Sequence, residues 1–205
     1  MAASLDYFIE LGVRNIRYSL NYEGRWDEES RDAFDEAFAD LQERYKAWYR
    51  EGVYFRFSLL DSKIITGLKE GYSLGDHCDF GRDEIAVSPR GHLYPCERLI
   101  GEDEGADVRI GTLHGGIDAA RRDELIRRKE AIKEDCRSCA LRPRCMTWCG
   151  CVNHALTGAV DEVSGLLCWF ERRLIQGADA VAGELFQEEN PLFIKRFYLP
   201  MARQR

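Results

Sequence analysis

The spacing of the cysteines constrains this 205-residue chain more than any other feature. There are eight cysteines, none before Cys78, and five of them lie within the sixteen residues from Cys136 to Cys151. Cys136 and Cys139 have two residues between them, the spacing at which one tight turn directs two thiolates at a single metal centre. Buried free thiols are the plainer interpretation of any cysteine, but this density favours metal ligands.

Thiolates bind zinc and iron–sulfur clusters in preference to hard cations. The four histidines are scattered without paired spacing, so we expect a site made of cysteines. Eight cysteines would supply two structural zinc sites, but such sites usually combine two separated C-x2-C pairs and this chain has one clear pair. The spacing therefore favours iron–sulfur clusters and leaves a zinc-stabilised interaction domain as an alternative.

Charge and hydropathy argue against other classes of function. Acidic residues outnumber basic ones by 36 to 29, so the net charge of −7 gives no general attraction to nucleic acid or anionic lipid. The basic run at 121–129 is interleaved with acidic residues and predicts a solvated helix face. No segment approaches the roughly 20 apolar residues that span a bilayer, and the start does not resemble a signal peptide. We expect no nucleic-acid partner, no membrane and a cytoplasmic location, where thiols stay reduced.

The first 66 residues predict a strand–helix–strand unit. Apolar residues alternate at 16–20 and 53–60, which indicates strands. A helix between them is indicated by an apolar stripe made of Phe34, Phe38, Leu41, Tyr45 and Trp48. Such a crossover predicts parallel strands, and two parallel strands do not form a stable sheet alone. We therefore expect residues 1–66 to be the C-terminal remnant of a larger α/β domain.

Beyond a glycine-rich linker at 67–75, the elements predicted are short. A β-hairpin is expected from 85–87 and 92–94, joined by the turn Ser88–Gly91. Helices are expected at 118–133 and 166–186, followed by an aromatic tail at 187–205. The chain is thus predicted to be an α+β protein with a cysteine-rich second domain at 76–186.

The order of the cysteines resembles the seven-cysteine SPASM motif. The matching pattern is Cys78-x12-Gly91-x4-Cys96, then Cys136-x2-Cys139-x5-Cys145-x3-Cys149, then Cys168. SPASM domains end many radical SAM enzymes that modify peptides and proteins, including anaerobic sulfatase-maturating enzymes. The resemblance covers roughly residues 75–170, and it implies that residues 1–66 are the end of a partial βα barrel.

The resemblance implies two auxiliary 4Fe–4S clusters with interleaved ligands. The first would be held by Cys78, Cys96 and Cys149. The second would be held by Cys136, Cys139, Cys145 and Cys168. The first set is one thiolate short. Cys151 either completes it or leaves one iron open to a substrate or exogenous ligand, and we favour the open position at this stage.

Glu97 directly follows Cys96 and is the candidate catalytic residue. In sulfatase-maturating relatives an acidic residue at this position takes a proton from the substrate, which is general-base chemistry. The plainer interpretation, which we favour, is a surface carboxylate that pairs with Arg98 or Arg90.

The C-x3-C-x2-C motif that holds the cluster for cleaving S-adenosylmethionine is absent from this sequence. That cofactor is therefore expected only if the missing N-terminal half or a partner chain is supplied. The resemblance implies part of a radical SAM peptide or protein maturase, which accepts or relays electrons and positions a peptide or protein substrate. A stand-alone electron-transfer or peptide-binding module that acts with a partner chain is the alternative, so enzymatic activity of the chain itself is left open.

Overall fold

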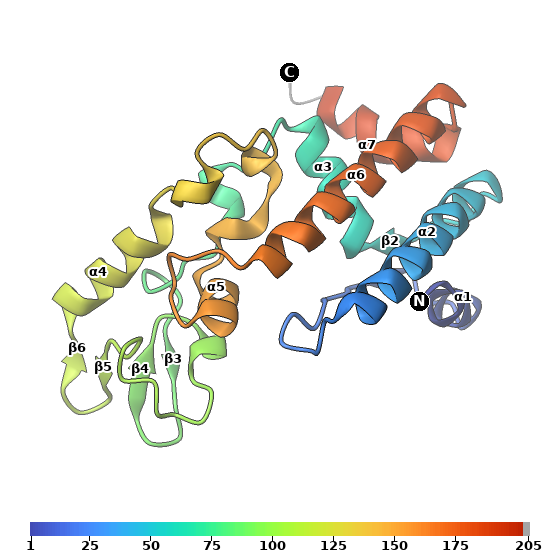
Figure 1. Ribbon diagram of the computed structural model, residues 1–205. Helices are drawn as coiled ribbons and strands as arrows, with labels where there is room; N and C mark the ends of the chain where they lie inside the picture. Colours follow the sequence, from blue (N-terminus) through green and yellow to red (C-terminus); the bar gives the residue numbers. More distant parts are fainter. Residues whose placement is uncertain (203–205) are drawn as a thin grey trace. The chain divides into compact units, whose positions relative to one another are not determined.

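The computed structural model describes residues 1–202, which divide into two compact units (Figure 1). Unit 1 contains residues 1–71 and the chain from Trp169 onward, and unit 2 contains Tyr72–Cys168. Helices combine with two small sheets, so the fold belongs to the predicted α+β class. The sequence placed residues 169–186 in the cysteine-rich domain, whereas in the structure these residues pack with unit 1.

Unit 1 begins with a strand–helix–strand arrangement. Its first elements are α1 (Ala2–Glu10), β1 (Asn15–Ile16), α2 (Glu28–Arg50), β2 (Arg56–Phe57) and α3 (Ser58–Leu68). The two strands pair in parallel, with Ile16 opposite Phe57, as the sequence predicts. The second strand is shorter than predicted, because α3 begins where alternation suggested more strand. A carboxylate oxygen of Asp61 accepts the backbone N–H of Phe57 at 2.8 Å and so stabilises the start of α3.

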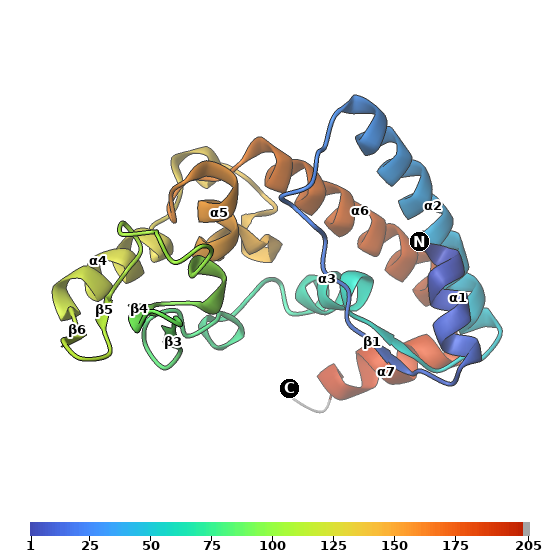
Figure 2. The same cartoon turned by 90° about the horizontal axis from the view of Figure 1, so that it is seen from below.

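Two long helices form the centre of unit 1 (Figure 2). The predicted apolar stripe of α2 is buried throughout. The second helix is α6 (Gly165–Gln187), which lies along α2. Two ion pairs join the helices, one between Arg173 and Asp35 and the other between Lys46 and Glu184. Both pairs span 138 residues of sequence, so the two helices run in the same direction at a constant register.

The predicted aromatic tail forms a helix instead. This helix, α7 (Pro191–Ala202), buries Phe193 and Phe197. The ring of Phe193 lies 5.4 Å from the ring of Tyr49 in α2, measured between centroids. The aromatic tail predicted at 187–205 therefore contains a helix over residues 191–202, because two aromatic side chains spaced by four give a helix an apolar face that it can bury.

Unit 2 contains a small antiparallel sheet and two helices. The sheet runs in sequence order through β3 (Ala86–Val87), β4 (His92–Tyr94), β5 (Gly111–Thr112) and β6 (Gly116–Ile117), and the helices are α4 (Ala119–Glu130) and α5 (Gly150–Thr157). Val87 pairs with Leu93, which confirms the predicted hairpin. No helix in the described part of the chain is long and apolar enough to cross a membrane.

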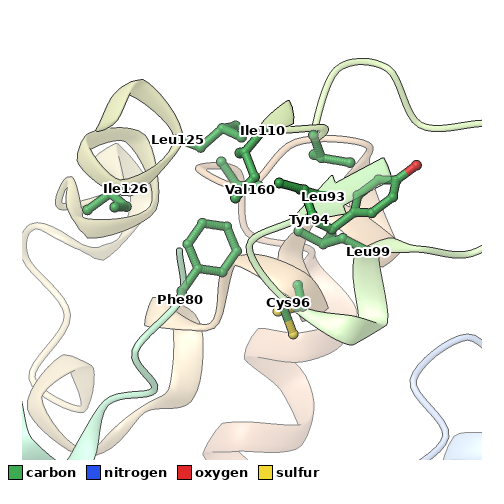
Figure 3. Packing of buried hydrophobic residues seen from close by; sticks show 11 residues of the cluster. Phe80, Leu93, Tyr94, Cys96, Leu99, Ile110, Leu125, Ile126 and Val160 are labelled. Atoms are coloured by element: carbon green, nitrogen blue, oxygen red, sulfur yellow. The ribbon is translucent and has the colours of Figure 1, made fainter. Parts of the chain in front are cut away.

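The core of unit 2 is small and contains cysteine. Figure 3 shows the buried cluster, which draws on the hairpin, α4 and the segments around α5. Its buried members are Phe80, Leu93, Tyr94, Cys96, Leu99, Val108, Ile110, Leu125, Ile126, Cys151 and Val160. Because two thiols occupy this core, its packing and its cysteine chemistry are linked.

Strand β5 tolerates only glycine at Gly111, which pairs with Ile117 of β6, and this leads to a testable prediction. The φ angle of Gly111 is +144°, and a Cβ atom there would lie 2.1 Å from the carbonyl oxygen of Gly116. We expect Gly111→Ala to lower the free energy of unfolding by about 2 kcal/mol or more, through backbone strain and overlap. The measurement is the urea-unfolding midpoint of the protein. Gly165→Ala, where a Cβ meets nothing within 4 Å, is the control, and equal midpoints for the two variants would contradict the prediction.

Candidate metal centre

The hairpin of unit 2 brings the Cys78 segment beside Cys96. The backbone N–H of Gly81 donates to the carbonyl oxygens of Pro95 at 3.0 Å and Glu84 at 3.1 Å. Gly81 has a φ of +70°, and a Cβ there would lie 3.2 Å from Pro95, so glycine permits this close approach. Cys96 follows β4 by two residues and is buried.

The start of α5 supplies Cys149 and Cys151. Cys149 is the N-cap residue, and its carbonyl oxygen accepts the backbone N–H of Asn153 at 3.1 Å. The buried amide of Asn153 donates to the carbonyl oxygens of Thr147 at 2.9 Å and Val160 at 3.2 Å. These bonds fix the first turn of α5 against the segments on both sides, so the positions of both thiols are well determined by the fold.

Four cysteines from three segments meet at this core. Cys96 and Cys151 are buried within it, and Cys78 and Cys149 pack against it. The thiol of Cys151 forms hydrogen bonds with Cys149 and with Cys96. The three cysteines that the motif implies for the first cluster are therefore near one another, together with the spare cysteine.

The contacts among these thiols shift their pKa values in opposite directions. The hydrogen bond from Cys151, aided by backbone N–H groups of the α5 first turn and by the charge of Arg98, lowers the pKa of Cys149 to about 6. The hydrogen bonds that Cys151 forms with Cys149 and Cys96 raise the pKa of Cys151. Burial raises the pKa of Cys78. These contacts favour the thiolate form at Cys149 over Cys151, and binding of a metal would displace the thiol protons.

A buried lysine lies beside the thiols. Lys129 of α4 is only 2% exposed, and its ammonium nitrogen is 5.8 Å from the ring centroid of Phe80 and 5.6 Å from that of Trp148. Its charge acts on Cys78. Within residues 1–202 no carboxylate lies at salt-bridge distance from this ammonium group. The prediction of a solvated face was therefore wrong at this residue, and a buried cation requires nearby negative charge, which a thiolate-bound centre would supply.

The cysteines implied for the second cluster lie on a series of short turns. The 3₁₀ helices Glu134–Cys136, Arg142–Arg144 and Met146–Trp148 follow one another, and the N–H of Cys139 donates to the carbonyl oxygen of Cys136 at 3.3 Å. Cys136 and Cys145 line a cavity of about 570 Å³, together with Cys78. Cys139 and Cys168 are not among the residues that line it. The structure thus brings two of these four cysteines to one space.

None of the eight cysteines forms a disulfide. Within residues 1–202, one group of three or more ligand atoms lies within 4.8 Å of one another, and it consists of Glu84, Cys96 and Glu97 rather than of cysteines. A tetrahedral zinc ion with Zn–S bonds of about 2.3 Å holds its sulfurs about 3.8 Å apart. A four-iron cluster separates its thiolates more widely, because each binds a different iron atom. Cys151 contacts Cys149 and Cys96 pairwise, but no three cysteine sulfurs of the described residues are mutually close enough to form a tetrahedral zinc site as they stand.

Glu97 has a partner that the sequence does not indicate. One of its carboxylate oxygens lies 3.6 Å from the sulfur of Cys96. A hydrogen bond with Glu97 raises the pKa of Glu84, and the same bond lowers the pKa of Glu97. The expected ion pair with Arg98 or Arg90 is replaced by this contact between carboxylates. The sequence does not indicate a role for Glu84. An isolated β-bridge between Phe80 and Glu84 positions this residue, and no sequence signal marks that bridge.

Models of known protein families and the curated proteins were both compared with the chain, and neither comparison found a match.

Proposed function

We propose that unit 2 holds two 4Fe–4S clusters and that the chain is the auxiliary-cluster part of a radical SAM enzyme that modifies a peptide or protein. The observation that carries this proposal is the meeting of Cys78, Cys96, Cys149 and Cys151 in one core beside the buried cation of Lys129. The SPASM-like order of the cysteines supports the division into two ligand sets.

The order of the cysteines supports iron–sulfur clusters over zinc, because structural zinc sites usually combine two C-x2-C pairs and this chain has one clear pair. In the described residues no three cysteine sulfurs are as close as one tetrahedral ion needs. The charges near the thiols suit an anionic thiolate centre of either kind, because Arg98 acts on Cys149 and Lys129 acts on Cys78. When bound, such centres accept and pass single electrons.

The other residues of unit 2 have supporting roles in this proposal. Phe80 and Trp148 cover the region around Lys129 with aromatic surface, which limits water and tunes the potential of a nearby centre. Glu97 is exposed beside Cys96, so its carboxylate is accessible to a substrate. The role that the resemblance gives it, accepting a proton from the substrate, stays part of the proposal.

Unit 1 supports the placement of the chain within such an enzyme. The parallel pairing of β1 with β2 around α2 is the connection used in βα barrels. We propose that it is the end of a partial barrel. Cleavage of S-adenosylmethionine would then require an N-terminal half or a partner chain that supplies C-x3-C-x2-C.

The test of the proposal is metal analysis of the protein purified without oxygen. We expect about eight iron atoms and about eight acid-labile sulfides per chain, as two four-iron clusters require. Zinc in a colourless protein, without sulfide, would contradict the proposal and favour a zinc-stabilised interaction domain.

A further inference from the structure

We propose that Cys151 is the fourth thiolate of the first cluster, so that this cluster has no iron open to a substrate. This inference rests on the proposed function and deepens it. The seven-cysteine pattern does not include a residue at this position, and the sequence by itself favoured an open iron. Three features of the structure argue for Cys151.

The first feature is position. Cys151 is only 4% exposed and shares the core with Cys96. Its thiol contacts both Cys96 and Cys149, two of the cysteines that the motif assigns to this cluster. In a four-iron cluster whose other irons bind Cys78, Cys96 and Cys149, the fourth iron would therefore lie beside the sulfur of Cys151 rather than face solvent or a substrate.

The second feature is the rigidity of the turn that carries Cys151. Asn153 is fully buried and its amide bonds hold the first turn of α5 on both sides. This turn cannot swing Cys151 away from Cys149 without breaking these buried bonds, which are costly to lose.

The third feature is the glycine between the two cysteines. A Cβ atom on Gly150 would lie 2.9 Å from Cγ of Lys129. Glycine therefore lets the stem of the buried lysine pass directly against the turn that bears Cys149 and Cys151. The charge of this lysine acts on Cys78, so the turn that bears Cys151 packs against the stem of a cation that offsets thiolate charge within the same ligand set.

The consequence concerns the role of the first cluster. A cluster with four protein thiolates cannot bind a substrate at iron, so it serves electron transfer alone. Any substrate contact in unit 2 must then come from side chains such as Glu97 rather than from an open iron.

The experiment compares the wild-type chain with Cys151→Ala, Cys151→Ser and Val152→Ala, all reconstituted with iron and sulfide without oxygen. Val152 is the adjacent buried residue of the same helix, so its variant controls for loss of packing. Each protein is oxidised briefly with ferricyanide. Ferricyanide takes one electron from the cluster. If one iron of the cluster has no protein thiolate, the oxidised cluster then releases that iron as Fe²⁺ and becomes 3Fe–4S. Iron content and the electron paramagnetic resonance signal of 3Fe–4S are measured.

We expect both Cys151 variants to fall from about eight to about seven iron atoms and to show the 3Fe–4S signal, while wild type and Val152→Ala show neither change. Equal iron content and equal spectra in Cys151→Ala and wild type would overturn the inference. A second measurement needs no variant. Cyanide added to the reduced wild-type protein should leave its electron paramagnetic resonance spectrum unchanged. A shift of that spectrum would reveal an open iron and would also overturn the inference. A wild-type chain that binds no iron at all would instead contradict the proposed function itself.

Discussion

Replacing one cysteine in each predicted ligand set should remove half of the iron in each case and all of it in combination. We expect Cys96→Ala and Cys139→Ala each to retain about four of about eight iron atoms, because each change destabilises a different four-iron cluster. Cys96→Ala removes the ligand of one of the three segments that hold the first cluster, whereas the Cys151 variants keep a ligand on all three segments. The double variant should bind almost none. Iron and acid-labile sulfide, measured on protein purified without oxygen, report the result.

A matched pair of double variants makes this assignment sharper. Cys96→Ala combined with Cys149→Ala removes two thiolates from the same predicted cluster, so about four iron atoms should remain. Cys96→Ala combined with Cys139→Ala affects both clusters and should leave none. If the two double variants retain the same amount of iron, the division of ligands between the clusters is incorrect.

Parts of the fold that depend on local pattern could be predicted from the sequence. The apolar stripe of α2 and the β3–β4 hairpin are carried by side-chain periodicity and turn residues within short segments, and both were predicted correctly. The parallel pairing of β1 with β2 followed from the helical crossover between them.

Helices that begin without a change in the side-chain pattern, such as α3, could not be predicted from the sequence. Phe55, Phe57 and Leu59 alternate across the boundary between β2 and α3, so the strand pattern continues into a helix. The helix begins at Ser58 because the carboxylate of Asp61 reaches back to the N–H of Phe57, a contact that tertiary structure has to position. The aromatic spacing of Phe193 and Phe197 was a usable signal for α7, although composition alone suggested a tail.

The metal site could be predicted in outline but not in its details. Cysteine spacing indicates which residues are ligands, because short spacings restrict what a turn can do. It does not reveal that Cys151 contacts Cys96 or that Glu84 contacts Glu97, since both contacts depend on how separate segments fold together. Lys129 shows the same limit. It belongs to a charged run, yet its position on α4 directs it into the core.

The largest stability effect is expected from a buried ion pair in unit 1. The ammonium nitrogen of Lys63 in α3 lies 2.7 Å from a carboxylate oxygen of Glu171 in α6, and the side chains are 3% and 2% exposed. Lys63→Met removes the cation but leaves the carboxylate in the protein interior. We expect a loss of about 3–5 kcal/mol in the free energy of unfolding, mainly because a buried charge loses its counter-ion.

Two further variants distinguish this cause from lost packing. Lys63→Met combined with Glu171→Leu removes both charges, so most of the stability should return. Asp35→Asn breaks the half-exposed pair with Arg173, where the side chains are 38% and 42% exposed, and should cost less than about 1 kcal/mol. Hydrogen exchange of peptides from α2 measures the opening free energy of unit 1 in the intact chain. If the double variant is as unstable as Lys63→Met, the loss comes from altered packing between α3 and α6 and not from removal of the cation beside Glu171.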